Sequence, residues 1–281
     1  MTSKPLHLVL DFDGTITQQD TIGVLADLGQ DFQLRQKAKI SPTWAQIVEE
    51  YGRDHKEYST GYQPASDQRS SIEDELVFLR QLRSVEHRSL RRVERSGLFR
   101  GLDEETLKQG GRDALRNGTI QLRDGFTDIM AAASHNKWHI SVLSVNWSTS
   151  FLRGVLEGYP VLDVVANEIL PDGRIVGPGH LGTAWKDSPL MTCEDKREAL
   201  SSLLLQQGSC ASDLVYFGDS TCDIECLTLG RGVAVALDIG STLMRTLERV
   251  GVNVPSVADR QQSDALVWAR SFQEVLDAGF L

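Results

Sequence analysis

The feature that most constrains the fold of this chain is an alternation of short apolar segments with longer helical ones. Apolar runs typical of buried strands occupy residues 6–10, 139–145, 162–166, 214–218 and 232–237. Segments with helical character follow most of them, at residues 149–157, 192–207, 223–229 and 242–250. This alternation predicts βαβ units and therefore an α/β fold, a doubly wound parallel sheet with helices on both faces.

Other segments extend this prediction toward both ends of the chain. A helix is expected over residues 126–136, and a β-hairpin around the turn Pro171-Asp172-Gly173. We also expect a last strand over residues 252–257 and a closing helix over residues 265–278.

A helical stretch interrupts the alternation directly after the first predicted strand. Ile72, Leu76 and Leu79 recur there at helical spacing, and Asp103 begins another helical segment. We interpret residues 18–119 as an inserted helical cap domain. Residues 1–17 and 120–281 then form the α/β core.

Composition excludes several classes of function. With 29 basic and 39 acidic residues the chain carries a formal net charge of −10, which argues against nucleic acid as a partner. No apolar run approaches the ~20 residues that span a bilayer, so no membrane association is expected. Only a short apolar run precedes Asp11, which argues against a signal peptide and for a cytoplasmic location. We expect a monomer or a homodimer.

Two carboxylates follow the first predicted strand, in Asp11-Phe12-Asp13-Gly14-Thr15. Residues two apart in an extended segment point to the same side, so Asp11 and Asp13 would share one space. Such an arrangement is unfavourable unless a cation is present or one carboxylate is protonated. The alternative is a turn that carries two solvated acids.

A second acidic pair follows the apolar run 214–218, in Gly218-Asp219-Ser220 and Asp223. Carboxylate oxygens that converge on one point suit Mg²⁺, which prefers octahedral oxygen coordination. The alternative is that Asp219 caps the next helix.

A hydroxyl and an ammonium complete the set of candidates. Ser144 ends a predicted strand, where its hydroxyl and the neighbouring backbone N–H groups of Val145 and Asn146 could bind a phosphate; the alternative is a helix cap. Lys196 lies in a first helical turn behind a Thr192–Asp195 capping box, where a cation indicates a nearby counter-charge. Lys186 competes with it for this role, and an exposed lysine is the alternative.

The order of these four sites resembles the haloacid dehalogenase superfamily of phosphatases and phosphotransferases. The resemblance implies that Asp11 is the nucleophile and that Asp13 is the general acid and base. Ser144 and Lys196 would bind the phosphoryl group. Mg²⁺ would be held by the Asp11 side chain, the Asp13 backbone carbonyl, Asp219 and Asp223.

The position of the insertion is similar to the type 1 cap of the phosphoserine phosphatase branch. That branch usually has a Glu nine positions after the nucleophile, where it meets the substrate amine; this chain has Asp20. The Ser-Gly pair usual at the second motif is Ser144-Val145 here. The first motif also resembles branch members that act on methylthio-ketopentenyl phosphate and on thiamine or similar phosphates.

These observations predict a Mg²⁺-dependent phosphatase that hydrolyses a small phosphorylated metabolite through an aspartyl-phosphate. Alternatives are a catalytically silent binding or regulatory protein and a phosphotransferase such as a mutase. Dehalogenation of a 2-haloacid is disfavoured, because Asp13, Asp219 and Asp223 are all present.

Side chains of the cap leave two choices open. Its arginines could bind a substrate carboxylate or second phosphate, or lie on a solvated helix face; they are Arg80, Arg83, Arg88, Arg91, Arg92, Arg95 and Arg100. Its aromatic residues could line the substrate pocket or pack the cap core; they are Trp44, Tyr51, Tyr58 and Tyr62.

Overall fold

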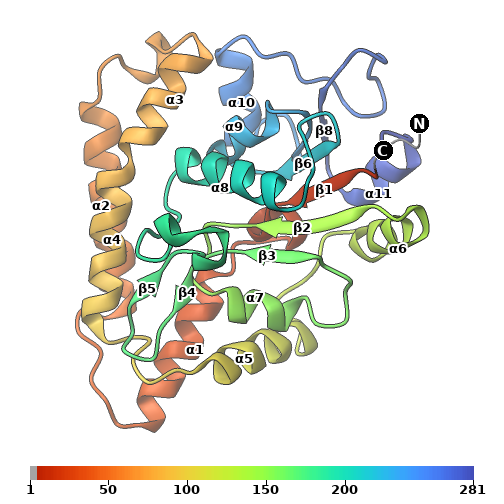
Figure 1. Ribbon diagram of the computed structural model, residues 1–281. Coiled ribbons are helices and arrows are strands. Elements are labelled where there is room, and N and C mark those ends of the chain that lie inside the picture. Colours follow the sequence, from red (N-terminus) through yellow and green to blue (C-terminus); the bar gives the residue numbers. More distant parts are fainter. Residues whose placement is uncertain (1–4) are drawn as a thin grey trace.

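The structure is a computed structural model that describes residues 5–281, so the first four residues of the predicted core lie outside it (Figure 1). A six-stranded sheet with strand order β3-β2-β1-β6-β7-β8 forms the centre of the molecule, and every neighbouring pair is parallel. Its strands are β1 (His7–Leu10), β2 (His139–Leu143), β3 (Asp163–Val165), β6 (Leu214–Gly218), β7 (Arg231–Val235) and β8 (Leu266–Ala269). The predicted doubly wound α/β fold is therefore confirmed.

Strand β1 lies in the middle of the sheet and is buried on both faces. Leu8 and Leu10 pack into a core with helices of one face, and Val9 packs into the core of the other. This two-sided burial explains why the strand reads as a continuous apolar run. Leu10 pairs with Val142 of β2 and with Phe217 of β6. The loops that follow these three strands therefore begin side by side.

Helices cover both faces of the sheet (Figure 1). Residues of α8, α9 and α10 share the core that contains Val9, whereas residues of α6, α7 and α11 share the core that contains Leu8 and Leu10. Their bounds are α6 (Phe126–Asn136), α7 (Thr149–Val155), α8 (Cys193–Gln206), α9 (Ile224–Leu227), α10 (Thr242–Arg249) and α11 (Phe272–Asp277).

Five helices lie between β1 and α6: α1 (Ile22–Arg35), α2 (Trp44–Gly61), α3 (Ile72–Gln81), α4 (Arg83–Ser96) and α5 (Glu104–Arg116). Helices α2 and α4 pack against each other beside the core (Figure 1). Helix α5 instead packs closely against α7 of the core. The domain boundaries at residues 17/18 and 119/120 stay a prediction.

The segments that lead into and out of the inserted helices are hydrogen-bonded to each other. Thr17 and Leu122 form an antiparallel bridge. The Gln18 N–H donates to the Gln121 carbonyl at 2.9 Å, and the Arg123 N–H donates to the Ile16 carbonyl at 2.8 Å. The chain thus leaves the core and returns to it at one place, which we call the stalk (residues 16–18 and 121–123).

The C-terminal part of the chain corrects two predictions. The last strand is β8 (Leu266–Ala269), not residues 252–257, and the closing helix begins only at Phe272. Pro255 has no N–H to give to a ladder, so this segment makes only an isolated bridge between Ser256 and Trp268. The residues from 266 onward were misread because LVWA is short and equally apolar in either state.

Strands β4 (Glu168–Ile169) and β5 (Ile175–Val176) form the predicted antiparallel hairpin. Among residues 5–281, no helix is both long enough and apolar enough to cross a membrane.

Candidate active site

The loop after β1 carries the first two acids and turns tightly against β6. Gly14 has a φ of +70°, and a Cβ at this position would lie 2.2 Å from Asp219 Oδ2. Only glycine combines this backbone conformation with so close an approach. Thr15 Oγ1 donates to Asp219 Oδ1 at 3.1 Å, which fixes the Asp219 carboxylate beside the loop.

Asp11, Lys196 and Asp223 form a buried charge cluster below this loop. The Lys196 ammonium lies 2.8 Å from Asp11 Oδ1 and 2.6 Å from Asp223 Oδ1. Lys196 lies in the first turn of α8 behind the predicted Thr192–Asp195 capping box, which is present. The counter-charges expected for this lysine are therefore two aspartates.

Lys186, the alternative to Lys196, lies in the loop before α8 and is not among the described residues that line the pocket containing Asp11. The geometry thus favours Lys196 for the predicted role.

Three carboxylates are close enough to share a cation. Single oxygens of Asp11, Asp219 and Asp223 lie within 4.8 Å of one another. Burial raises the pKa of Asp219 to about 7, and Asp223 adds to this effect. Burial also raises the pKa of Asp11 well above its usual value, while Lys196 opposes the shift. One lysine leaves this cluster with excess negative charge, and the all-oxygen donor set fits a divalent ion such as Mg²⁺.

Asp223 differs from the other two because both of its oxygens are already bound. Oδ1 accepts from Tyr216 Oη at 2.7 Å and from Lys196, and Oδ2 accepts from the Ser220 N–H at 3.0 Å and its hydroxyl at 2.9 Å. Asp223 therefore orients Lys196 and the loop after β6, and it would reach an ion mainly through water.

Asp13 is held away from this cluster. Its Oδ1 accepts from the Thr21 N–H at 2.7 Å and the Thr21 hydroxyl at 2.6 Å, and its Oδ2 accepts from Asn146 Nδ2 at 2.8 Å. Burial raises the pKa of Asp13 to about 6, with a contribution from Asp20. A carboxyl group with a pKa in this range exchanges protons readily near neutral pH.

The loop after β2 lies beside the loop after β1. Ser144 is buried, its hydroxyl accepts from the Asn146 N–H at 3.1 Å, and it lines the same pocket as Asp11 and Lys196. Val145 also lines this pocket. The Asn146 Nδ2 group donates to Asp13 and to the Thr21 hydroxyl, and its Oδ1 accepts from the Ser148 N–H. The side chain thus supports the candidate acid.

Asp20 lies at the exposed end of the pocket, where α1 begins. Its Oδ1 accepts from the Ile22 N–H at 2.7 Å. Asp20 thus lies on the pocket wall, and its contact with the substrate stays a prediction.

Several residues of the site were not anticipated. The buried Arg123 donates from Nε to the Thr15 carbonyl at 2.9 Å and also binds the Gly14 carbonyl, so it braces the loop after β1. The residues around Arg123 in the sequence form no motif that would indicate this role. Tyr216 did carry a signal, since it is a polar aromatic residue inside an otherwise apolar strand.

The pocket above Asp11 has a volume of about 460 Å³ and lies between the core loops and helices α2 and α4. Trp44, Tyr51 and Glu86 line it from the cap, and Trp147 lines it from the core. Tyr58 and Tyr62 instead pack against Phe78, with ring centroids 5.4 and 5.0 Å from it. The predicted aromatic set thus divides between the pocket and the packing of the cap.

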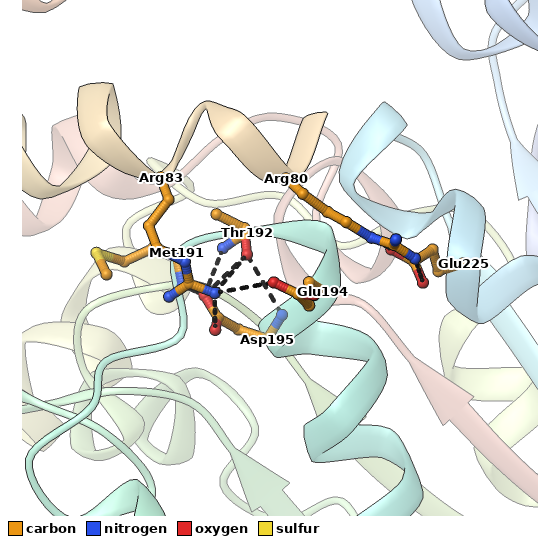
Figure 2. Close-up of polar contacts among 7 residues, drawn as sticks. All are labelled: Arg80, Arg83, Met191, Thr192, Glu194, Asp195 and Glu225. Atoms are coloured by element: carbon orange, nitrogen blue, oxygen red, sulfur yellow. Dashed lines mark hydrogen bonds and ion pairs between the residues drawn. The ribbon is translucent and has the colours of Figure 1, made fainter. Parts of the chain in front are cut away.

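Four of the seven arginines named from the cap sequence are held by acidic residues outside the pocket. Arg80 binds Glu225 of α9 through both carboxylate oxygens, and Arg83 Nη2 lies 2.6 Å from Asp195 Oδ1 of α8 (Figure 2). Arg88 and Arg92 pair with Asp54. Among the residues that the structure describes, no arginine lines the pocket. The alternative in which they bind a second anion of the substrate is therefore not supported.

The fold and this cluster together define an α/β protein with helices inserted after its first strand and an acidic site at the carboxyl edge of its sheet. The model of the haloacid dehalogenase-like hydrolase family matches residues 8–228. The chain belongs to this family.

The proteins similar to this chain include curated relatives and solved structures. A CTO1 family protein of Schizosaccharomyces pombe is 28% identical over 232 residues, 79% of this chain and 78% of that protein. The bifunctional TH2 protein of Arabidopsis thaliana, described as mitochondrial, is 25% identical over 265 residues, 88% of this chain but 42% of that protein. A phosphoserine phosphatase with an analogue of its phospho-aspartyl intermediate aligns with a TM-score of 0.54 at 14% identity, over 98% of this chain and 99% of that one.

Proposed function

We propose that this protein is a Mg²⁺-dependent phosphatase that hydrolyses a small-molecule phosphomonoester through an aspartyl-phosphate on Asp11. The observation that carries the proposal is the Asp11 carboxylate on the Lys196 ammonium, at the floor of a pocket that is large enough for a small ester. A pocket bounded by α2 and α4 disfavours protein and nucleic acid substrates. Phosphatases among the similar folds support the same class of reaction.

The residues divide the reaction between them. One Asp11 oxygen attacks phosphorus while Lys196 holds the other and neutralises part of the phosphoryl charge. Asp13 gives its proton to the leaving alcohol oxygen, and the phosphoryl group remains on Asp11. The Asp13 carboxylate then takes a proton from the water that attacks phosphorus, which releases phosphate and regenerates Asp11.

Positioning supports each of these steps. Thr21 and Asn146 hold Asp13 in place, and Ser144 offers its hydroxyl to the phosphoryl oxygens. Asp11, Asp219 and the Asp13 backbone carbonyl would hold Mg²⁺, with Asp223 behind them. When bound there, Mg²⁺ offsets the repulsion between the anionic nucleophile and the anionic ester.

The test is phosphate release from a panel of phosphomonoesters, with and without Mg²⁺, by the wild type and Asp11→Asn. We expect the substitution to lower kcat/KM by at least about a thousandfold, because it removes the nucleophile and one carboxylate of the Mg²⁺ site. Asp31→Asn, an exposed change on α1, serves as the matched control and should leave turnover unchanged.

Wild-type-like hydrolysis by a folded Asp11→Asn would contradict the proposal. Phosphate and Mg²⁺ binding without hydrolysis of any ester would favour a silent binding protein, and phosphoryl transfer to a sugar would favour a mutase.

A further inference from the structure

Glu86 is a carboxylate in the pocket that the reaction above does not use. It lies on α4 and is largely shielded from solvent, and Tyr51 Oη donates to its Oε1 at 2.9 Å. Within residues 5–281, the Glu86 side chain makes no ion pair, and Tyr51 is its single hydrogen-bond partner. A shielded carboxylate without a cation is costly, and a ligand that brings a positive charge removes this cost.

The charges around Glu86 point the same way. Arg83, one turn before it on α4, is turned away to Asp195 of α8. The only cation among the described residues of the pocket is Lys196, which is already bound by Asp11 and Asp223. Beyond the phosphoryl end, the charged groups of the wall are therefore acidic. A substrate carboxylate or second phosphate would find no partner there.

Aromatic rings also line this pocket, and one of them, Tyr51, is bonded to Glu86. Trp44 and Tyr51 come from α2, and Trp147 follows Asn146 in the loop after β2. Trp44 and Trp147 lie edge to face with centroids 6.1 Å apart. Faces of such rings attract ammonium groups, most strongly where water is excluded.

We propose that this pocket selects phosphomonoesters whose alcohol portion carries a positive charge, which Glu86 binds among Trp44, Tyr51 and Trp147. This inference rests on the proposed function, since Asp11 takes the phosphoryl end of the same molecule. Asp20, at the mouth of the pocket, adds a second negative charge on the path of such a substrate.

The experiment compares two esters of equal shape and different charge: phosphocholine and 3,3-dimethylbutyl phosphate, in which carbon replaces the quaternary nitrogen. The ratio of their kcat/KM values is measured for the wild type, Glu86→Gln and Glu49→Gln. Glutamine keeps an oxygen for Tyr51 and removes only the charge. Glu49 lies on the exposed face of α2 and provides the control for loss of a cap carboxylate.

We expect the wild type to prefer the charged ester by about tenfold or more. Glu86→Gln should bring the ratio close to one, and Glu49→Gln should preserve it. A wild-type ratio near one, or a preference that survives in Glu86→Gln, would overturn the inference while leaving a phosphatase in place.

A separate outcome concerns the proposed function. If neither ester nor p-nitrophenyl phosphate is hydrolysed, the phosphatase assignment fails, and calorimetric binding of the same two esters decides the inference. Tighter binding of phosphocholine that is lost in Glu86→Gln supports it, and equal binding of the two esters refutes it.

Discussion

The four aspartates of the site differ in what holds them. Asp11 has a lysine, Asp13 has hydroxyl and amide donors, Asp219 has a threonine hydroxyl, and both oxygens of Asp223 are occupied. Burial raises the pKa of the first three, to different extents. Identical side chains are therefore suited to the different roles that we propose for them, because their neighbours differ.

At the other end of β1, His7 makes the stability of the fold depend on pH. It is buried between Ser141 and Ser209, with ring nitrogens 2.9 and 3.1 Å from their hydroxyls. Burial, and to a smaller extent His139, lowers the pKa of His7 from 6.5 to about 4. Above pH 6.5 His7 is neutral in both the folded and the unfolded state. Protonation of His7 therefore takes nothing from the free energy of unfolding in this range. As the pH falls from 6.5 toward 4, His7 binds a proton in the unfolded chain before it does so in the folded protein. Protonation thus favours the unfolded chain and lowers the free energy of unfolding.

We therefore expect His7 to remove about 2 kcal/mol from the free energy of unfolding between pH 7.5 and pH 5. Urea unfolding of wild type and His7→Gln at both values measures this, and the variant should lose about 2 kcal/mol less than the wild type. His135→Gln, on the exposed end of α6, is the control. Equal pH dependence in wild type and His7→Gln would contradict the assignment.

At the scale of elements, α5 and α7 pack at backbone contact. A Cβ on Gly154 would lie 2.0 Å from the Lys108 carbonyl oxygen, and one on Gly111 would lie 2.2 Å from the Phe151 carbonyl oxygen. The inserted segment is thus attached to the core by a helix pair that admits no larger residue.

Gly154→Ala should lower the free energy of unfolding by about 3 kcal/mol, because the helices must move apart. Gly52→Ala is the matched control: it lies inside α2 with nothing within 4 Å of its Cβ position. That change should stabilise the protein by about 0.5 kcal/mol through helix propensity. Chemical denaturation of both variants measures their free energies of unfolding. Equal changes in the two variants would show that α5 and α7 are not packed at backbone contact.

Helix α4 connects the cap to Asp11 in a different way. Arg83 binds Asp195 Oδ1, while Oδ2 of the same carboxylate accepts from the N–H groups of Met191 and Thr192 (Figure 2). Asp195 thereby caps α8, and the next residue is Lys196. The ammonium that neutralises Asp11 is supported by a helix end to which the cap is directly bonded.

The elements that the sequence predicted well share a physical cause. Strands buried on both faces, such as β1 and β6, read as apolar runs that end at acids, and capping residues marked the start of α8. The strand β8 was missed because four apolar residues fit a helix or a strand equally well.

Contacts between segments far apart in the chain were harder to predict. The spacing of Asp11, Asp13, Asp219 and Asp223 was visible, but the pairing of Asn146 with Asp13 depends on the register of β1 and β2. No sequence pattern around Arg123 or Glu86 indicates their partners, because those partners lie far away in the sequence and are brought close only by folding.

For the whole molecule, a ligand that mimics the aspartyl-phosphate should stabilise the folded state. Beryllium fluoride with Mg²⁺, at about one hundred times its Kd, should raise the Tm by about 5 °C, because it binds the native state and not the unfolded chain. Differential scanning fluorimetry measures the shift. Either component alone should shift the Tm less, and Asp11→Asn should abolish the effect. A wild type that hydrolyses phosphoesters without any such shift would argue against Asp11 as the nucleophile.

The paired stalk has a consequence for how this chain can be altered. Thr17 and Leu122 are bridged to each other, so the inserted segment between them leaves the core and returns to it at one point. We expect the chain to tolerate inserted segments of other lengths between the two stalk segments without a shift of the sheet strands. Any such replacement needs a substitute for α5, because the face of α7 that contains Gly154 packs against α5 and would otherwise be exposed to water.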